Sequence, residues 1–218
     1  VARPFYRATG ASRSTRFKAP CFNKACMKLS DYMAERIAAH GISQVFMVTG
    51  GGAMHLNDSF GHHPRLTCIF NHHEQAAAIA AEGYARVTNR PALVNVTTGP
   101  GAINALTGVW GAWTDSIPML VVSGQVKRET LMATYALPGL RQLGDQEADV
   151  IPMVKGITKY AALVSDPASI RYHLEKALFL ATSGRPGPCW LDIPIDVSAS
   201  QVVHDEMRAY DPAEDRPP

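Results

Sequence analysis

Short apolar runs that end in glycine or polar residues alternate along most of this chain with longer segments of helical periodicity. The runs lack the polar alternation of a half-exposed strand, so they predict strands that are buried on both faces. We expect these strands at 44–48, 66–70, 92–97, 118–123 and 189–193. Strands separated by helices predict an α/β fold, with a doubly wound, mainly parallel sheet covered by helices on both faces.

The segments between the strands have the spacing of amphipathic helices. We expect Ser30 to cap the first helix and Gly41 to end it. Further helices are expected at 53–60, 73–87, 99–113 and 168–182. Glycines 108 and 111 make one face of the 99–113 helix narrow, which suits close packing against another element, in this subunit or in another. Residues 126–147 fit neither pattern and are expected to form a long functional loop.

Composition excludes several classes of protein. Of 218 residues, 46% are hydrophobic and 18% are charged, which excludes a disordered chain. The four cysteines form no CxxC pair, so neither a disulfide framework nor a zinc site is expected. The longest apolar stretch, 105–124, contains Asp115 and several glycines, so we expect no membrane span and a cytoplasmic location.

The charge is unevenly distributed. Residues 1–26 hold six Arg and Lys and no acid. The net charge of the whole chain is +2, so residues 27–218 carry a net charge of −4. The acidic body gives no reason to expect a nucleic-acid partner. We interpret 1–26 as a basic leader, either flexible or added for expression, with a transit peptide as the alternative. Residues 27–200 are the expected domain and 201–218 the expected start of a linker to a further domain, within which the charged, Pro-rich residues 205–218 are expected to stay out of the core.

Ligands of doubly wound sheets bind beyond the carboxyl ends of the strands, where three segments of this chain carry candidate site residues. The first is Thr49–Gly52. A dinucleotide fingerprint fails here, because His55 stands where a third glycine is needed and no acid ends the next strand. What remains is a tight turn, which is either purely structural or lets a flat ligand approach the backbone.

The second segment is Asn71–Gln75, where a strand becomes a helix. A carboxyl group buried at such a junction, as we expect for Glu74, holds its proton more tightly than in water and can both give and take one. The alternative is an acid that merely favours the helix dipole. His72 and His73 are adjacent at a strand end and point in opposite directions, so no metal site is expected there.

The third segment is Thr97–Asn104, where glycine and proline open a helix and leave backbone N–H groups free to face a ligand. A well-packed internal helix is the alternative. Alone, this signal is weak.

Together these segments indicate a protein family more specifically than any one of them does. Residues 71–86 resemble the HEQ…AAxGYAR signature of thiamine-diphosphate enzymes. Similar blocks of that family follow in order, at 98–108, 115–118, 123–126, 184–188 and 192–197. The chain most resembles the acetolactate synthase-like group over 27–200, which implies the amino-terminal, pyrimidine-binding domain of such an enzyme.

The resemblance implies a site. Glu74 would hydrogen-bond N1′ of the cofactor's aminopyrimidine and so activate thiamine diphosphate for decarboxylation or carboligation of a 2-keto acid, the work of a transferase or lyase. Gln125 would face the reacting centre. The remaining cofactor-binding residues would be Gly51, Gly52, Thr98, Gly99 and Asn104.

The sequence departs from the family pattern in one central respect. The Gly-Asp-Gly…Asn motif that holds the diphosphate and Mg²⁺ is absent, and in the family it lies in a separate carboxyl-terminal domain. The resemblance therefore implies half a site, inactive alone and completed by that domain or a second subunit in a homodimer or tetramer. Acetolactate synthases tend to have Ala-Phe-Gln-Glu where this chain has residues 144–147, and Arg141 nearby either pairs with a substrate carboxylate or is solvated. The alternatives are a natural subunit of a split keto acid decarboxylase, or a non-catalytic module that keeps the fold.

Overall fold

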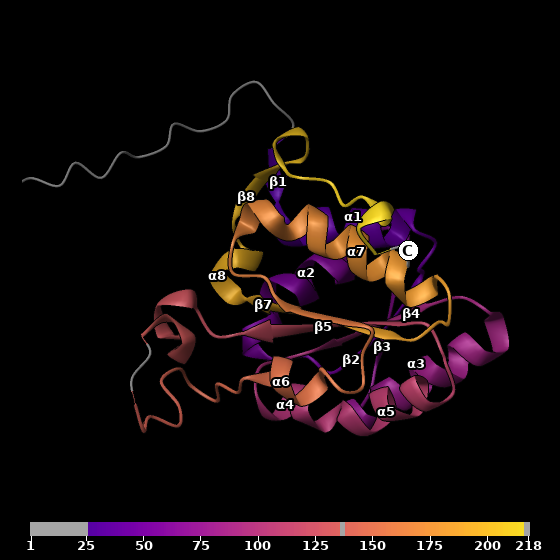
Figure 1. Cartoon of the computed structure of the whole chain (residues 1–218), viewed down its shortest axis with the longest axis horizontal. Helices are drawn as coiled ribbons and strands as arrows, with labels where there is room; N and C mark the ends of the chain where they lie inside the picture. The colour runs from indigo at the N-terminus through magenta and orange to yellow at the C-terminus, as the bar shows by residue number, and fades with distance from the viewer. Residues whose placement is uncertain (1–25, 136–137, 216–218) are drawn as a thin grey trace, which may run out of the picture.

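A six-stranded parallel sheet with the strand order β3-β2-β4-β5-β7-β6 forms the centre of the protein (Figure 1). This computed structural model describes residues 26–135 and 138–215. The sheet strands are β2 (Gln44–Met47), β3 (Thr67–Phe70), β4 (Ala92–Val96), β5 (Met119–Gln125), β6 (Tyr160–Leu163) and β7 (Pro188–Pro194). The expected doubly wound α/β architecture is confirmed.

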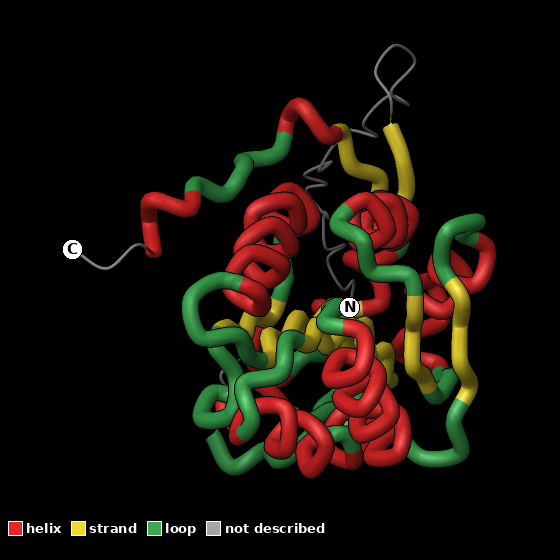
Figure 2. Tube along the Cα trace, turned by 90° about the vertical axis from the view of Figure 1, so that its right-hand side faces the viewer, coloured by secondary structure: helices red, strands yellow, loops and turns green. Residues whose placement is uncertain are grey.

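Helices cover both faces of the sheet, as the end-on view in Figure 2 shows. One layer contains α1 (Leu29–Ala39), α2 (Met54–His62), α7 (Ile170–Thr182) and α8 (Ile195–Ser198). The other contains α3 (Glu74–Thr88), α4 (Pro100–Asn104), α5 (Leu106–Thr114) and α6 (Val150–Val154).

Alternating side chains of the strands feed two separate hydrophobic cores. In β2, Val45 and Met47 pack with α1, α2 and α7, whereas Phe46 packs with α3 and α5. In β5, Leu120 and Val121 divide between the two cores in the same way. This alternation follows from the two-residue period of a strand, and it explains why each strand sequence is apolar at almost every position.

The expected strands are confirmed to within a residue or two at each end, but some local predictions are wrong. Ser30 does not cap α1, which begins at Leu29; its hydroxyl instead accepts a hydrogen bond from Ser59 at 2.8 Å. The expected helix at 99–113 is two consecutive helices, α4 and α5. Strand β6 was not expected. The long loop after β5 is confirmed, apart from short 3₁₀ turns.

The narrow face of α5 packs within this chain. A Cβ atom at Gly108 would lie 2.5 Å from the Cβ of Ala78, and one at Gly111 would lie 2.7 Å from a carboxyl oxygen of Glu82. Both partners are on α3. The two glycines therefore serve close packing of α3 and α5.

The segment that follows α8 packs back onto the domain. Strand β8 (Gln201–Val203) pairs antiparallel with β1 (Cys26–Lys28), and the side chains of Met207 and Tyr210 are buried. The expectation that residues 205–218 stay out of the core is wrong at Met207, which joins the hydrophobic core together with residues of α1 and α7. Tyr210 is buried against Tyr172 and Phe179 of α7.

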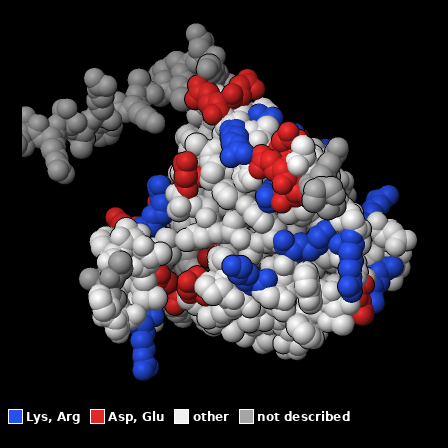
Figure 3. Space-filling model, in the orientation of Figure 1, with Lys and Arg blue, Asp and Glu red and all other residues white. Residues whose placement is uncertain are grey.

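Two contacts hold the end of this segment on α7: Lys176 and Asp215 lie 2.7 Å apart, and Tyr172 donates to Glu214 at 2.8 Å. Arg208 pairs with Glu214 within the segment, also at 2.7 Å. Acidic and basic groups are correspondingly mixed in the upper part of the face drawn in Figure 3. The basic leader, residues 1–26, lies outside the described residues except for Cys26. No helix in the described ranges has the length and apolar character needed to cross a membrane.

Candidate functional site

Four neighbouring strands bring the predicted site residues to one edge of the sheet. The strand order β3-β2-β4-β5 places the turns after these strands side by side, because parallel strands end at the same edge. These turns carry, in that spatial order, Glu74, the glycines 50–52, residues 97–101 and Gln125.

Glu74 is the first residue of α3, and its side chain is buried, with 9% exposed. Asn104, at the end of α4, donates from Nδ2 to Glu74 Oε2 at 3.0 Å. Among the described residues, no hydrogen bond reaches Oε1. A Cβ atom on Gly101 would lie 3.3 Å from Oε1, so the glycine leaves this oxygen room. The carboxyl is thus fixed through one oxygen while the other remains available.

The helix that carries Glu74 begins with a histidine cap. His73 has extended backbone angles, and its ring Nδ1 accepts a hydrogen bond from the backbone N–H of Gln75 at 3.1 Å. His72, beside it, is exposed. Within residues 26–135 and 138–215, no group of three or more His, Cys, Asp or Glu is arranged to hold a metal ion.

The glycine turn after β2 is tightly packed at Gly52 and open at Gly51. A Cβ atom on Gly52 would lie 1.9 Å from Thr98 Oγ1, whereas one on Gly51 would meet nothing within 4 Å. The backbone N–H of Gly52 donates to Thr97 Oγ1 at 3.1 Å. Side chains are therefore excluded at Gly52 by its neighbours, and Gly51 presents bare backbone to the outside.

Thr98 and Gly99 have structural partners within the chain. Thr98 donates from its hydroxyl to the carbonyl of Gly124 at 3.2 Å, which ties β4 to β5. Gly99 has a φ of +55°, and a Cβ there would lie 1.9 Å from the carbonyl oxygen of Gln146. Only glycine fits at this position, and the long loop after β5 rests directly on it.

Gln125 lies at the same edge but points into the protein, with 2% exposed. Its Nε2 donates to Ala148 O and to Asp192 Oδ2, each at 2.9 Å, and its Oε1 accepts from the N–H of Val126 at 2.9 Å. Both of its amide hydrogens are thus used within the chain, which leaves it no free donor for a reacting group.

A buried acid that the sequence reasoning did not select lies next to Gln125. Asp192, in β7, accepts from Ser123 Oγ at 2.6 Å, and Ser123 in turn accepts from Trp190 Nε1 at 2.8 Å. Burial raises the pKa of Asp192 from an ordinary 3.8 to about 7, although the donors Ser123 and Gln125 favour the ionised form. The signal in the sequence was an acid within an otherwise apolar strand.

The loop that follows β5 encloses a cavity of about 270 Å³ against the carboxyl ends of β5, β6 and β7. Glu147 organises the loop by accepting backbone N–H groups of Met132 at 2.7 Å, Leu143 at 3.2 Å and Gly144 at 3.1 Å. The cavity is lined by apolar loop residues together with Gln125, Glu147, Asp149 and Asp192. Arg141 is exposed on this loop.

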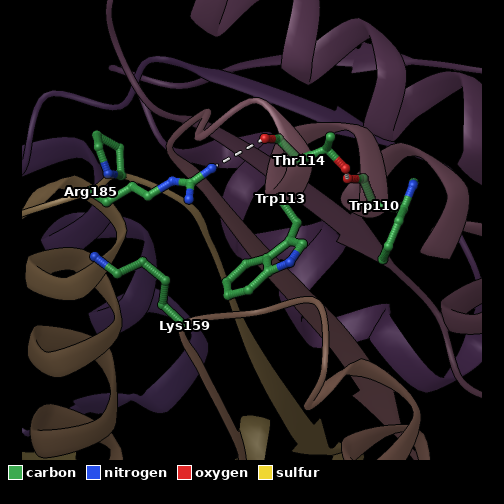
Figure 4. A pocket seen from close by; sticks show the side chains of 6 residues that line it. Trp110, Trp113, Thr114, Lys159 and Arg185 are labelled. Atoms are coloured by element: carbon green, nitrogen blue, oxygen red, sulfur yellow. Dashed lines mark hydrogen bonds between the residues drawn. The ribbon is translucent and has the colours of Figure 1, made fainter.

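A second hollow, of about 380 Å³, lies at the opposite edge of the sheet (Figure 4). It is lined by Trp110 and Trp113 of α5 and by Lys159 and Arg185, which precede β6 and β7. Its cations bind the chain itself: Lys159 Nζ donates to Ser183 O at 2.6 Å, and Arg185 Nε donates to Ser116 Oγ at 2.6 Å. This hollow is separate from the edge that carries Glu74.

Comparison with known proteins agrees with the arrangement of this edge. The sequence profile of the thiamine pyrophosphate enzyme family, for its N-terminal TPP binding domain, matches residues 27–152. The chain belongs to this family. The matched region contains the glycine turn, Glu74, residues 97–104 and Gln125, and so includes every site residue that the sequence analysis selected.

Relatives of the family are similar over most of the chain. An acetolactate synthase of Arabidopsis thaliana chloroplasts is 36% identical over 81% of this chain and 25% of its own length. The mitochondrial acetolactate synthase of Schizosaccharomyces pombe is 38% identical over 74% of this chain and 23% of its own length. The acetolactate synthase large subunit of Haemophilus influenzae is 34% identical over 84% of this chain and 32% of its own length. The chain is therefore a TPP-binding N-terminal domain similar to that of acetolactate synthases, and it spans 23–32% of the length of these relatives.

Proposed function

We propose that the chain binds the aminopyrimidine half of thiamine diphosphate at the carboxyl edge of β3, β2 and β4, with Glu74 hydrogen-bonded to N1′ of the ring. The observation that carries this proposal is the buried Glu74 carboxyl, whose Oε2 is held by Asn104 while its Oε1 accepts no hydrogen bond from any described residue. When bound, thiamine diphosphate supplies a carbon nucleophile that adds to the carbonyl group of a 2-keto acid.

The role of Glu74 is to hold and return a proton at N1′. A carboxyl with one oxygen fixed can present the other to a ring nitrogen in a defined direction. Burial excludes water, which would otherwise compete for the same hydrogen bond. Asn104 is then a positioning residue, because its amide contacts Glu74 rather than open space.

The glycines suit a flat ligand beside this carboxyl. Gly51 is exposed with nothing near its missing Cβ, so a ring can approach the backbone there. Gly52 and Gly99 allow close packing beneath this surface, since the side chain of Thr98 fills the space next to Gly52 and the loop after β5 fills the space next to Gly99. We infer that Gly51 contacts the pyrimidine and that Gly52, Thr98 and Gly99 shape its binding surface.

We further propose that the parent enzyme is a 2-keto acid carboligase or decarboxylase that acts as a homodimer or tetramer. The acetolactate synthase relatives support this substrate class. The diphosphate and Mg²⁺ would be held by another domain or subunit, because the Gly-Asp-Gly motif is absent from the 218 residues. The exposed side chains of Ile103 and Trp110, on the outer face of α4 and α5, are the candidate subunit contact.

The test is Glu74→Gln in the assembled enzyme that contains this chain. The substitution keeps the volume and an acceptor for Asn104 but removes the exchangeable acid. We expect cofactor affinity to change little, while exchange of the cofactor's C2 proton, followed by NMR in deuterated solvent, slows by about 10²–10⁴-fold, the usual contribution of general acid–base catalysis.

Glu82→Gln is the matched control, because Glu82 is on the same helix, about two turns beyond Glu74, and pairs with Arg86. It should leave C2 exchange unchanged. If Glu74→Gln exchanged the C2 proton of the cofactor at the wild-type rate, Glu74 would have no role in cofactor activation.

A further inference from the structure

Gln125 touches both ends of the long loop that joins β5 to α6. Its Oε1 accepts from the N–H of Val126, where the loop begins, and its Nε2 donates to the carbonyl of Ala148, where the loop ends, each at 2.9 Å. One buried amide therefore closes the base of the loop at residues 126 and 148.

The surroundings fix which way this amide faces. Trp190 donates to Ser123, Ser123 donates to Asp192, and Asp192 Oδ2 accepts from Gln125 Nε2. A reversed amide would point its oxygen at Ala148 O and its N–H groups at the N–H of Val126. Both loop contacts would then be lost, so the orientation seen is the one that satisfies both ends of the loop.

The closed loop reaches the candidate cofactor edge. The carbonyl oxygen of Gln146 lies so near Gly99 that an added Cβ would be 1.9 Å from it. Gln146 is two residues before Ala148, and Glu147 between them gathers three backbone N–H groups of the loop. A displacement of Ala148 at the base of the loop therefore also displaces Gln146 at its contact with Gly99, because only Glu147 separates the two residues and its carboxyl is hydrogen-bonded to the loop.

We propose that Gln125 is a positioning residue that clamps the loop 126–148 and thereby holds Gln146 against Gly99 at the start of α4. The clamp itself is inferred only from the hydrogen bonds of Gln125 to Val126 and Ala148. Its consequence for cofactor binding rests on the proposed function. In this role Gln125 acts through the loop and does not itself touch the substrate.

The first experiment is Gln125→Met, which keeps the size and removes the hydrogen bonds. Two of the three lost bonds reach the loop, and each contributes about a fivefold change in local opening, so amide hydrogen exchange at Val126 and at 143–149 should become about 25-fold faster. Gln142→Leu is the control, because Gln142 lies in the same loop and donates only to the neighbouring carbonyl of Gly144. It should leave exchange at 126 and 146–149 unchanged.

A second variant separates the clamp from general destabilisation. Gln125→Glu keeps an acceptor for Val126 and loses the donor to Ala148, so 146–149 should exchange faster while Val126 stays protected. Amides of β4 report on the fold itself. If both loop ends exchanged as slowly in Gln125→Met and Gln125→Glu as in wild type, the clamp would be overturned. It would also be overturned if both ends of the loop exchanged equally fast in Gln125→Glu.

The link to the site is measured by thiamine diphosphate affinity of the assembled enzyme. Gln125→Met should weaken affinity about tenfold, whereas Glu74→Gln should leave loop exchange as in wild type. Faster loop exchange with unchanged affinity would overturn the link to the site while leaving the clamp. The outcome for Glu74 is read separately, from C2 exchange.

Discussion

Asp192 makes the stability of this domain depend on pH in a direction opposite to that of most carboxyl groups. Its pKa is raised by burial from 3.8 to about 7, so the folded state holds a proton that the unfolded state releases. Between these two values the folded state binds more protons, and the free energy of unfolding falls as pH rises. The stabilisation is complete below the unfolded pKa and is lost as pH rises through the folded pKa.

The size of the effect follows from the shift. One pKa unit corresponds to about 1.4 kcal/mol, so the full shift of roughly three units is worth about 4 kcal/mol, of which about 3 kcal/mol falls between pH 5 and pH 9. Asp149 adds to the shift by repulsion, whereas the hydrogen bonds from Ser123 and Gln125 oppose it.

The test compares wild type with Asp192→Asn by urea unfolding at pH 5 and pH 9. The Asp192→Asn variant has altered hydrogen bonds at both pH values, but its side chain does not ionise, so it has no charge to bury. Wild type should therefore lose about 3 kcal/mol more than the variant on going from pH 5 to pH 9. An equal difference at both pH values would refute the reasoning, because it would mean that the donors around Asp192 support the ionised form as well as water does.

Other substitutions test the packing of the site and of the carboxyl-terminal segment. Asn104→Leu removes the donor to the candidate proton-transfer group and should slow C2 exchange of bound cofactor about tenfold, as NMR would measure. Gly52→Ala places a methyl group on Thr98 and should lower the free energy of unfolding in urea by about 1–3 kcal/mol, whereas Gly51→Ala should change it by less than about 0.5 kcal/mol. Met207→Ala should lower it by about 2–5 kcal/mol if the segment after β8 is part of the core, and no loss would show that this segment is only loosely attached.

The central strands could be predicted from sequence because burial on both faces produces continuous apolar runs. This holds for β4 and β5, whose side chains are buried at every position. Strand β6 was missed although residues 160–164 are all apolar, because it is a short edge strand of half-buried residues and alanine, at two of its four positions, favours strands only weakly. Met207 and Tyr210 were misjudged because their charged and Pro-rich neighbours dominate the local composition, while the burial of these two side chains comes from contacts with distant helices.

The candidate site divides in the same way between local and distant signals. Glu74 and the glycine turn were predictable, because a strand–turn–helix junction and its glycines lie within a few residues of each other. The partners of Gln125 were not, since Ala148 and Asp192 are 23 and 67 residues away in sequence. A glutamine at the end of a strand has the same local pattern whether it faces a ligand or holds a loop, so only the fold could distinguish these roles.

The distance between Glu74 and Asn104 depends on helix packing about one turn beyond each residue. Glu74 begins α3 and Asn104 ends α4, and the following helix α5 runs beside α3 in the same direction, with no room for a side chain at Gly108, where a Cβ would lie 2.5 Å from that of Ala78. Close approach of the two helices is what allows an asparagine to reach the carboxyl at 3.0 Å. The small residues of α5 therefore matter to the proposed chemistry without touching it, because they determine whether one oxygen of Glu74 is fixed and the other left to meet the cofactor.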